Sequence, residues 1–271
     1  MKIGIIGVGF VGGAMKKVFE EKNIEVFAYD KYKKYDAIEE VCKSDIIFLC
    51  LPTLFIEECG YDKKPIYETC DYLEEMQYKG SVVVKSTVEP GTVKKLNKRY
   101  SFDIYHNPEF LTARTAYEDF KNQTHIVIGV DLKKESLNVY NFYKKHWPNA
   151  KISICKTEES EAMKLFCNNF YSMKIMIFNE FYDLCKKQNL DYNIITELML
   201  KNEWINKMHT EVPGPDGKLG YGGACFIKDT NALLEHTKRI GSLNSILNSC
   251  IKERNLLRED QTNIIKINGV K

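Results

Sequence analysis

Three glycines near the N-terminus constrain the fold of this chain more than any other feature. Gly7, Gly9 and Gly12 form the pattern GxGxxG, which follows the apolar run 2–6 and precedes a helical stretch, and a second apolar run ends at Asp30. In a βαβ unit the first glycine makes the tight turn, the second lets a pyrophosphate approach the backbone, and the third lets the helix pack on the strand. The pattern therefore predicts a dinucleotide site at the helix N-terminus.

Asp30 indicates which dinucleotide this turn accepts. A carboxylate at the end of the second strand accepts hydrogen bonds from the adenosine ribose hydroxyls and repels a 2′-phosphate, so the sequence favours NAD over NADP. A glycine turn in a Rossmann-like domain that binds nothing is the alternative interpretation. The residues expected to contact the cofactor at this turn are Gly7, Gly9, Phe10, Val11, Gly12 and Asp30.

The first half of the chain alternates short apolar runs with helical stretches. The runs are rich in β-branched residues and alternate little between polar and apolar, which is typical of strands covered on both faces of a parallel sheet. Strands separated by helices predict an α/β fold with a doubly wound sheet, here a Rossmann-type NAD-binding domain over residues 1–155. The expected strands are residues 2–6, 24–29, 46–50, 81–85, 103–106 and 125–129.

An all-helical domain built on one long helix is expected over residues 156–271. Residues 157–187 contain no Gly or Pro, and their apolar residues recur at steps of three and four. Glutamates lie at one end and lysines at the other, as the helix dipole favours. Because residues 175–178 are apolar on every side, this helix needs partners on several faces. We expect a second copy of the chain to supply some of them in a homodimer; an ordinary core helix is the alternative.

Two more helices are expected after a loop rich in Gly and Pro. The first should run from about Asp229 to Arg239 and stop at Gly241, and the second should start with Ser242 as its N-cap and end near Asp260. The apolar residues of the second helix that should face inward are Leu243, Ile246, Leu247, Cys250 and Leu257.

Composition excludes several classes of function. The 39 Lys and Arg residues nearly balance the 37 Asp and Glu residues, so nothing indicates a nucleic-acid partner or an anionic membrane surface. No apolar run reaches the roughly 18 residues of a membrane span. The nine cysteines are scattered without a CxxC pair. This pattern argues for the reducing cytoplasm and against a metal site.

One of those cysteines lies at the end of the Gly-rich loop. Cys225 follows two glycines and an alanine and precedes Lys228 and Asp229, where a helix is expected to begin. A helix N-terminus and a nearby lysine both favour the thiolate, which is the nucleophilic form of cysteine. Single cysteines are mostly core residues, so it is the Gly, Lys and Asp neighbours that mark Cys225 as a candidate nucleophile.

Further polar residues lie where a doubly wound sheet presents its ligand-binding ends. Thr87 follows one expected strand, and Glu109 follows the next within the segment 107–111. On the long helix, Lys164 and Asn168 are four residues apart and share a face outside the apolar stripe. A solvated surface lysine is the alternative for Lys164.

Together these segments resemble the UDP-glucose/GDP-mannose dehydrogenases, which are NAD-dependent four-electron oxidases of nucleotide sugars. The resemblance runs from Met1 to about Glu259, and the segments occur in the family's order. They are GVGFVG (7–12), Asp30, LPT (51–53), STVEPGT (86–92), NPEFL (107–111), EAMKLFCNNFYSMKIMIFNE (161–180) and VPGPDGKLGYGGACFIKDT (212–230).

The resemblance implies a mechanism and a role for each matching residue. The Cys225 thiolate captures the sugar aldehyde as a thiohemiacetal, which is oxidised to a thioester and hydrolysed. Lys164 and Asn168 match the residues that stabilise the oxyanion. Asp229 matches the carboxylate that works with a water molecule, and Thr87 the residue that holds this water. Glu109 matches the glutamate near the nicotinamide and the thioester hydrolysis step. Further contacts to the cofactor are implied for Thr53, Thr87, Glu109 and Lys228.

The chain also departs from the family pattern. Leu54 and Ile227 stand where the family usually has Pro. The chain stops near the expected start of a further α/β domain, which supplies much of the nucleotide contact, and the segment 263–269 is either a lone strand and turn or a tail. UDP-glucose is the expected substrate. Because of the missing domain, we expect weak binding of nucleotide sugar by this chain alone. Activity should be low or absent unless a separate substrate-domain polypeptide or the dimer partner closes the substrate cleft.

Two other functions fit part of the pattern. A two-electron dehydrogenase of the 3-hydroxyacid or 6-phosphogluconate type pairs the same two domains but uses no cysteine, so the Cys225 segment argues against it. A non-catalytic NAD-binding or assembly protein is the other alternative, and the intact set of Lys164, Asn168, Cys225 and Asp229 argues against that.

Overall fold

The computed structural model describes residues 1–131, 137–260 and 264–265. The chain divides into two compact units. The sheet unit comprises Met1–Thr53 and Asp62–Lys164, and the helical unit comprises Leu54–Tyr61 and Leu165–Lys271. The domain boundary expected after residue 155 lies two residues before the long helix begins and stays a prediction.

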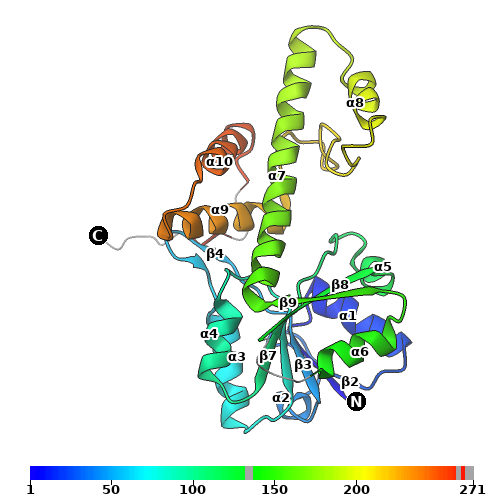
Figure 1. Cartoon of the computed structure of the whole chain (residues 1–271), viewed down its shortest axis with the longest axis vertical. Coiled ribbons are helices and arrows are strands. Elements are labelled where there is room, and N and C mark those ends of the chain that lie inside the picture. The colour runs from blue at the N-terminus through cyan, green and yellow to red at the C-terminus, as the bar shows by residue number, and fades with distance from the viewer. Residues whose placement is uncertain (132–136, 261–263, 266–271) are drawn as a thin grey trace. The chain divides into compact units, whose positions relative to one another are not determined.

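The sheet unit is built around a seven-stranded sheet within the described residues, with the order β2-β1-β3-β6-β7-β8-β9 (Figure 1). All six expected strands are confirmed to within two residues at either end. The strands are β1 (Ile3–Ile6), β2 (Val26–Tyr29), β3 (Ile46–Leu49), β6 (Ser81–Val84), β7 (Asp103–His106), β8 (His125–Val130) and β9 (Lys151–Lys156). The helices of this unit are α1 (Phe10–Glu21), α2 (Ile38–Val41), α3 (Lys64–Glu75), α4 (Thr92–Arg99), α5 (Ala116–Lys121) and α6 (Asn138–His146).

The sheet differs from the expected parallel one at one end. Strands β2, β1, β3, β6 and β7 are parallel neighbours, but β8 pairs antiparallel with β7 through His106 and Gly129. β8 and β9 are parallel to each other. The β9 strand was not predicted, because its polar and apolar residues alternate and it lies half exposed at the edge. The sheet is therefore mixed, although both of its faces are covered.

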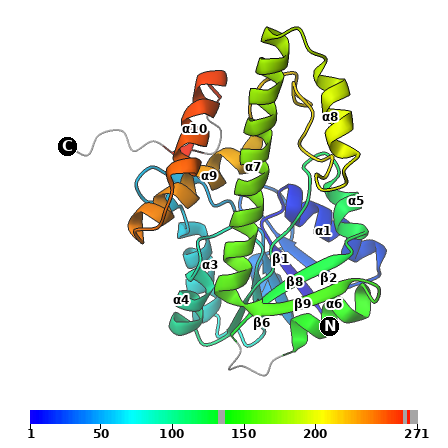
Figure 2. The same cartoon turned by 45° about the horizontal axis from the view of Figure 1, so that its top comes forward.

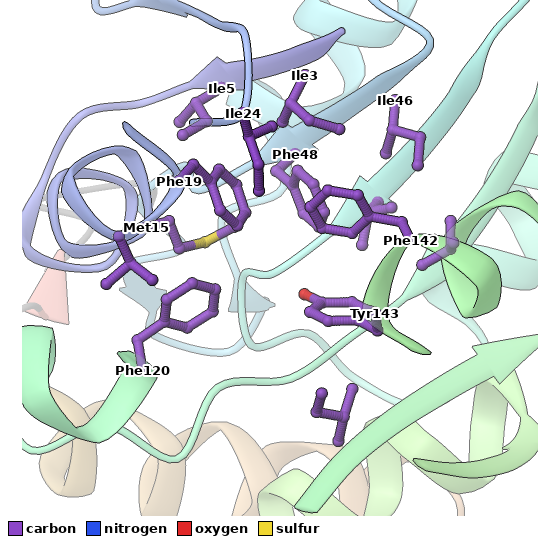
Figure 3. Close-up of a cluster of buried hydrophobic side chains, with 14 of the residues drawn as sticks. Ile3, Ile5, Met15, Phe19, Ile24, Ile46, Phe48, Phe120, Phe142 and Tyr143 are labelled. Carbon is purple, nitrogen blue, oxygen red and sulfur yellow. The ribbon is translucent and has the colours of Figure 1, made fainter. Parts of the chain in front are cut away.

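Each face of the sheet carries its own hydrophobic core, because neighbouring strand residues point to opposite faces. On one face Ile3, Ile46 and Phe48 pack with residues of α1, α5 and α6; on the other Ile47 and Leu49 pack with residues of α2, α3 and α4. Figure 3 shows the aromatic centre of the first core, where the rings of Phe19 and Phe142 lie edge to face at 5.4 Å. Two covered faces explain why the strands are almost uniformly apolar.

The order of the strands creates a reversal point at the carboxyl ends of β1 and β3. From β1 the chain passes to β2 on one side, and it later returns to β3 on the other. The chain leaves these two strands at Gly7 and Cys50. In open α/β sheets this is where ligands bind, since the connections diverge and leave the strand ends accessible.

The helical unit is built on α7 (Thr157–Lys187), which has the predicted bounds and begins within the sheet unit. Its 31 residues correspond to a length of about 46 Å. α8 packs against the C-terminal part of α7 through Phe178, Cys185 and Tyr192 (Figure 2). The other elements are α8 (Tyr192–Leu200), α9 (Gly223–Arg239), α10 (Ser245–Leu257) and a small sheet of β4 (Phe55–Ile56), β5 (Gly60–Tyr61) and β10 (Ile264–Ile265) in the order β10-β4-β5. β10 falls in the segment 263–269, and the remaining residues of that segment lie outside the described ones.

The expected starts of the two shorter helices and some of the expected inward residues are wrong. α9 begins at Gly223, six residues before the expected Asp229, because Gly222 and Gly223 read as loop in the sequence but lead directly into the helix. α10 begins at Ser245 and not after Ser242. Leu243, which was expected to face inward, is 97% exposed, and Ile246 is also exposed, while Leu247 is buried as expected. No helix among the described residues is long and apolar enough to cross a bilayer.

Candidate active site

The glycine turn has the geometry that its sequence predicts. Gly7 has a φ of +93°, and a Cβ atom there would lie 2.5 Å from the Cys50 carbonyl oxygen. A Cβ on Gly12 would lie 2.0 Å from the Gly7 carbonyl oxygen. Around Gly9, which is the N-cap of α1, a Cβ would meet nothing within 4 Å. The turn is thus closely packed where strand and helix meet and open where a pyrophosphate would approach.

Asp30 lies beside this turn, at the end of β2. Its carboxylate accepts hydrogen bonds from the backbone N–H of Val8 at 2.8 Å and of Tyr32 at 2.9 Å. These bonds fix the carboxylate next to the glycine turn. Phe10 and Val11, in the first turn of α1, are exposed and half-buried. The residues present therefore fit a dinucleotide with free ribose hydroxyls.

The loops after β3 and β6 are bonded to each other. The Thr53 hydroxyl donates to the Thr87 carbonyl oxygen at 2.8 Å, and the Ser86 hydroxyl donates to the Leu51 carbonyl oxygen at 2.6 Å. Thr53 and Thr87 are both buried. The structure thus places the LPT and STVEPGT segments side by side at the carboxyl edge of the sheet.

The carboxylate of Glu161 organises the end of the second loop. Its two oxygens accept hydrogen bonds from the backbone N–H of Gly91 and Val93, at the start of α4. The side chain comes from α7 and is fully buried. Burial raises the pKa of Glu161 to about 8, although the backbone N–H groups oppose this shift. Glu161 therefore caps α4 and links the loop that carries Thr87 to α7.

Glu109 and Lys164 form a buried ion pair in the sheet unit. Lys164 Nζ lies 3.1 Å from Glu109 Oε1, and both side chains are less than a tenth exposed. The other carboxylate oxygen of Glu109 accepts from the Leu111 N–H at 2.7 Å. Lys164 is thus no solvated surface lysine, and it forms a buried ion pair with a residue 55 positions earlier in the chain.

A second buried lysine supports the Asn107–Leu111 segment. Lys85 Nζ donates to Asn107 Oδ1 at 2.8 Å and to the Pro108 carbonyl oxygen at 3.4 Å. Burial lowers the pKa of Lys85 to about 8, and the nearby Glu109 carboxylate opposes this shift. Burial, with the Lys85 charge as a smaller cause, also lowers the pKa of His106 to about 3, so this imidazole is neutral at pH 7. Lys85 thus holds the turn that carries Glu109, while Nδ1 of His106 lies 2.8 Å from the Ser160 hydroxyl.

In the helical unit, Cys225 lies in the first turn of α9. The N-cap of that helix is Gly222, and the Cys225 side chain is half-buried. The N-terminal end of a 17-residue helix favours a negative charge, so this position favours thiolate over thiol. Because the helix has already begun at Gly223, Asp229 lies about one turn beyond Cys225, as expected.

Asp229 is the fully buried centre of a polar network in the same unit. Its Oδ2 accepts from Asn168 Nδ2 at 2.6 Å, and its Oδ1 pairs with Lys228 Nζ at 2.6 Å. The Tyr61 hydroxyl donates to the same Oδ1, and Lys228 Nζ lies 4.8 Å from the centre of the Tyr61 ring. The carboxylate is 0% exposed. Asn168, Lys228 and Asp229, three residues that the sequence singled out, are thus brought together around one carboxylate.

Sequence reasoning missed four residues of these arrangements. Tyr61 precedes Asp229 by 168 positions, and nothing in its own segment indicates a carboxylate partner. Lys85 directly follows strand β6 and His106 is the last residue of β7, so a titratable group at each of these strand ends was a usable signal. Glu161 lies within the predicted long helix, but its neighbours Glu158 and Glu159 favour its interpretation as part of a solvated helix end.

The sequence profile of the UDP-glucose/GDP-mannose dehydrogenase family matches the chain in two parts. Its NAD-binding domain matches residues 32–147, and its central domain matches residues 158–255. The glycine turn at residues 7–12 precedes the first matched residue. The two matches follow each other in the chain and separate close to the start of α7.

Individual proteins support the same relationship. The UDP-glucose 6-dehydrogenase of Campylobacter jejuni is 25% identical over 98% of this chain and 75% of its own length. The UDP-glucose 6-dehydrogenase of Rickettsia prowazekii is 31% identical over 78% of this chain and 49% of its own length, so the match spans about half of that relative. The structure of a UDP-glucose dehydrogenase from Pyrobaculum islandicum is similar with a TM-score of 0.81 at 23% identity, covering 94% of this chain and 68% of that one. At that identity the likeness supports the fold alone.

Proposed function

Because the chain belongs to the UDP-glucose/GDP-mannose dehydrogenase family, we propose that it oxidises the C6 hydroxyl of a nucleotide sugar to the acid. UDP-glucose is the substrate we favour, since the relatives from Campylobacter jejuni and Rickettsia prowazekii are named for it. The cofactor is NAD, which supplies the hydride acceptor for each of the two oxidation steps when bound. One sugar alcohol, two NAD and one water thus give one carboxylate, two NADH and three protons.

Cys225 carries the substrate between the two oxidations. Its thiolate adds to the C6 aldehyde to form a C–S bond, and the resulting hemithioacetal oxygen takes up a proton. Loss of a hydride from C6 and of that proton leaves a thioester. Water then attacks the thioester carbonyl, the C–S bond breaks, and the thiolate is regenerated with release of the acid.

The polar residues of the two units supply charge stabilisation and proton transfer. Lys164 and Asn168 stabilise the oxyanion formed when the thiolate or water adds to the carbonyl. Asp229 accepts a proton through a water molecule that Thr87 helps to hold. Glu109 takes part in thioester hydrolysis. The backbone at Gly7, Gly9 and Gly12, with the Asp30 carboxylate, binds the dinucleotide, and Thr53, Thr87, Glu109 and Lys228 add further contacts to it.

One observation carries this proposal. Cys225 lies at a helix N-terminus one turn before a fully buried carboxylate, and this carboxylate is bonded to Asn168 and Lys228. A two-electron dehydrogenase needs no such cysteine, and a chain that only binds NAD needs neither this cysteine nor the carboxylate one turn beyond it.

Product stoichiometry tests the proposal. The purified chain is incubated with NAD and, separately, UDP-glucose, GDP-mannose and a UDP-N-acetylhexosamine, and the NADH formed per sugar consumed is measured by absorbance. Two NADH per sugar is expected with one member of the panel. One NADH per substrate consumed would instead support the two-electron type. Calorimetric binding of NAD without turnover of any sugar would support either a non-catalytic protein or the need for a separate substrate-domain polypeptide. The need for a separate substrate-domain polypeptide stays a prediction that the same panel addresses.

The surface of α7 supports a homodimer. Within the part of the chain that the structure describes, Phe166 and Phe170 of its apolar stripe are 59% and 64% exposed. Ile177, Phe181 and Leu184 continue the exposed stripe towards the end of the helix. A contiguous exposed apolar face of this kind marks an association site. We therefore propose that two copies pair along α7, which the long uninterrupted helix in the sequence also indicates.

A further inference from the structure

The loop that leads into Cys225 is unusually rich in glycine. Gly217, Gly220 and Gly223 all have positive φ angles, between +69° and +78°. Glycine loses more backbone freedom on folding than any other residue, so such a loop is ordered only if contacts hold it. The α9 helix that it enters has no side-chain cap, because its N-cap is Gly222. The position of the Cys225 thiol therefore depends on what anchors this loop.

Two buried arginines of the α10 segment provide anchors. Arg254 is 1% exposed, and its Nε donates to the Tyr221 carbonyl oxygen at 2.9 Å. Arg258 donates through one terminal nitrogen to the Gly220 carbonyl oxygen at 3.2 Å and through the other to Asp216 Oδ2 at 2.6 Å. The planar guanidinium fork thus holds two points of the loop at once, which a lysine ammonium does with less directional precision.

Packing and charge complete the anchor. A Cβ atom on Gly222 would lie 2.4 Å from an Arg258 terminal nitrogen, so the backbone just before α9 lies directly on the guanidinium. Asp260 accepts from both arginines, with Oδ2 2.8 Å from Arg258, and partly neutralises their buried charge. Burying two cations is costly unless they are paired and hydrogen-bonded in this way.

Two further contacts fix the same loop from other helices. The Gly220 N–H donates to Asn179 Oδ1 of α7 at 2.9 Å, and the Tyr221 hydroxyl lies 3.2 Å from the Thr230 hydroxyl of α9. The arginines are the charged part of this anchor, and they bind the residues nearest to the start of α9.

We propose that Arg254 and Arg258 are positioning residues that hold residues 216–222 and thereby keep Cys225 in the first, thiolate-favouring turn of α9. The proposal deepens the proposed function and rests on Cys225 as the nucleophile. Neither arginine touches the reacting atoms in this account. Each acts through the loop backbone, so its removal should slow the chemistry of Cys225 and leave cofactor binding unchanged.

The test compares alkylation of two cysteines in the full chain. Arg254→Lys and Arg258→Lys keep the charge and lose the fork, while Lys252→Met changes an exposed residue of the same helix as the control. Iodoacetamide labelling at pH 7 is followed by mass spectrometry of the Cys225 peptide, and the exposed Cys59 serves as an internal reference. If the arginine variants lose the ordered start of α9, the alkylation rate of Cys225 should fall by about threefold to fivefold relative to that of Cys59. The control should match the wild type.

Steady-state kinetics separates positioning from a purely structural role. At a temperature well below unfolding, the lysine variants should lower kcat by about tenfold or more and leave the KM for NAD within about twofold. Unchanged or faster labelling of Cys225 overturns the proposal. If the wild type oxidises no nucleotide sugar, the proposed function fails, and the labelling experiment still decides whether the arginines position the thiol.

A milder variant guards against loss of folding. Asp216→Asn removes the charge of one partner of Arg258 at a half-exposed position and leaves both buried arginines in place. It should slow Cys225 labelling in the same direction by a smaller factor, about twofold. If Cys225 is labelled at the wild-type rate both in this variant and in whichever lysine variant folds, the arginines do not position Cys225 and the proposal is wrong.

Discussion

Replacing Glu161 with Gln should reverse the order of stability between wild type and variant as the pH rises. The carboxylate is fully buried, and burial raises its pKa from 4.5 to about 8. Between these two pH values the folded chain binds a proton that the unfolded chain has lost. The stability contributed by this group is therefore fully present below pH 4.5 and is lost as the pH rises through 8.

The magnitude follows from that pKa. A tenfold change in proton affinity corresponds to about 1.4 kcal/mol, so ionising Glu161 costs the folded state about 5 kcal/mol at pH 9. Gln has no such cost. However, its amide keeps an acceptor for only one of the two N–H groups, of Gly91 and Val93, and leaves the other facing a donor. That loss is worth about 1–3 kcal/mol at every pH.

Urea unfolding between pH 5 and pH 9 measures the difference. At pH 5 the wild type should be more stable by about 1–3 kcal/mol. At pH 9 the variant should be more stable by about 2–4 kcal/mol, and the two curves should cross between these limits. Glu159→Gln, at an exposed position of the same helix, controls for the change in net charge. The reasoning is wrong if the free energies of unfolding of the two proteins change in parallel with pH, or if the wild type becomes more stable relative to the variant as the pH rises. Either result would mean that the two N–H groups lower the pKa of Glu161 more than burial raises it.

Four further predictions concern the proposed function. Cys225→Ser should lower acid formation by about a thousandfold or more while calorimetric NAD binding persists, and acid production at the wild-type rate would exclude the mechanism. Asp30→Asn should weaken NAD binding by about tenfold to a hundredfold, since hydrogen bonds to a charged group contribute about 1.5–3 kcal/mol. The variant should also prefer NAD over NADP less strongly than the wild type does. Equal use of both cofactors by the wild type would contradict the role assigned to Asp30. Phe170→Glu should give a monomer by light scattering where the wild type gives a dimer, and a monomeric wild type at micromolar concentration argues against the α7 interface. Tyr61→Phe should reduce kcat by about tenfold with the KM for NAD unchanged, because it removes one hydrogen-bond donor from the buried Asp229 carboxylate. An unchanged kcat would mean that the Tyr61 ring contributes to packing only.

The elements that the sequence predicted well are those specified by local patterns. The bounds of α7 agree because a run without Gly or Pro, with charges of the right sign at each end, defines a helix without reference to the rest of the chain. The start of α9 was misplaced because Gly222 and Gly223 favour a loop on propensity alone, and tertiary contacts decide where this helix begins. Leu243 was assigned inward on helical spacing, but the helix begins after it.

In the candidate site, too, features set by local sequence were predicted and contacts between distant residues were not. The glycine turn and Asp30 lie within one βαβ unit, so their spacing carried the information. The Tyr61–Asp229 and Glu109–Lys164 contacts join distant parts of the chain, and a single sequence holds no signal for such pairs. The direction of β8 was equally hidden, because an apolar strand reads the same whichever way it pairs.

Strand β9 bears on the solubility of the protein. It lies at one end of the described sheet, so one row of its backbone groups faces away from any described neighbour. Its Ile154 is 46% exposed, and an open apolar strand edge is a template for stacking between chains. Lys151 and Lys156 are exposed at its two ends. When the β9 edges of two molecules approach each other, parallel or antiparallel, a lysine of one edge meets a lysine of the other, and the like charges repel. The lysines thus act as gatekeepers against intermolecular aggregation.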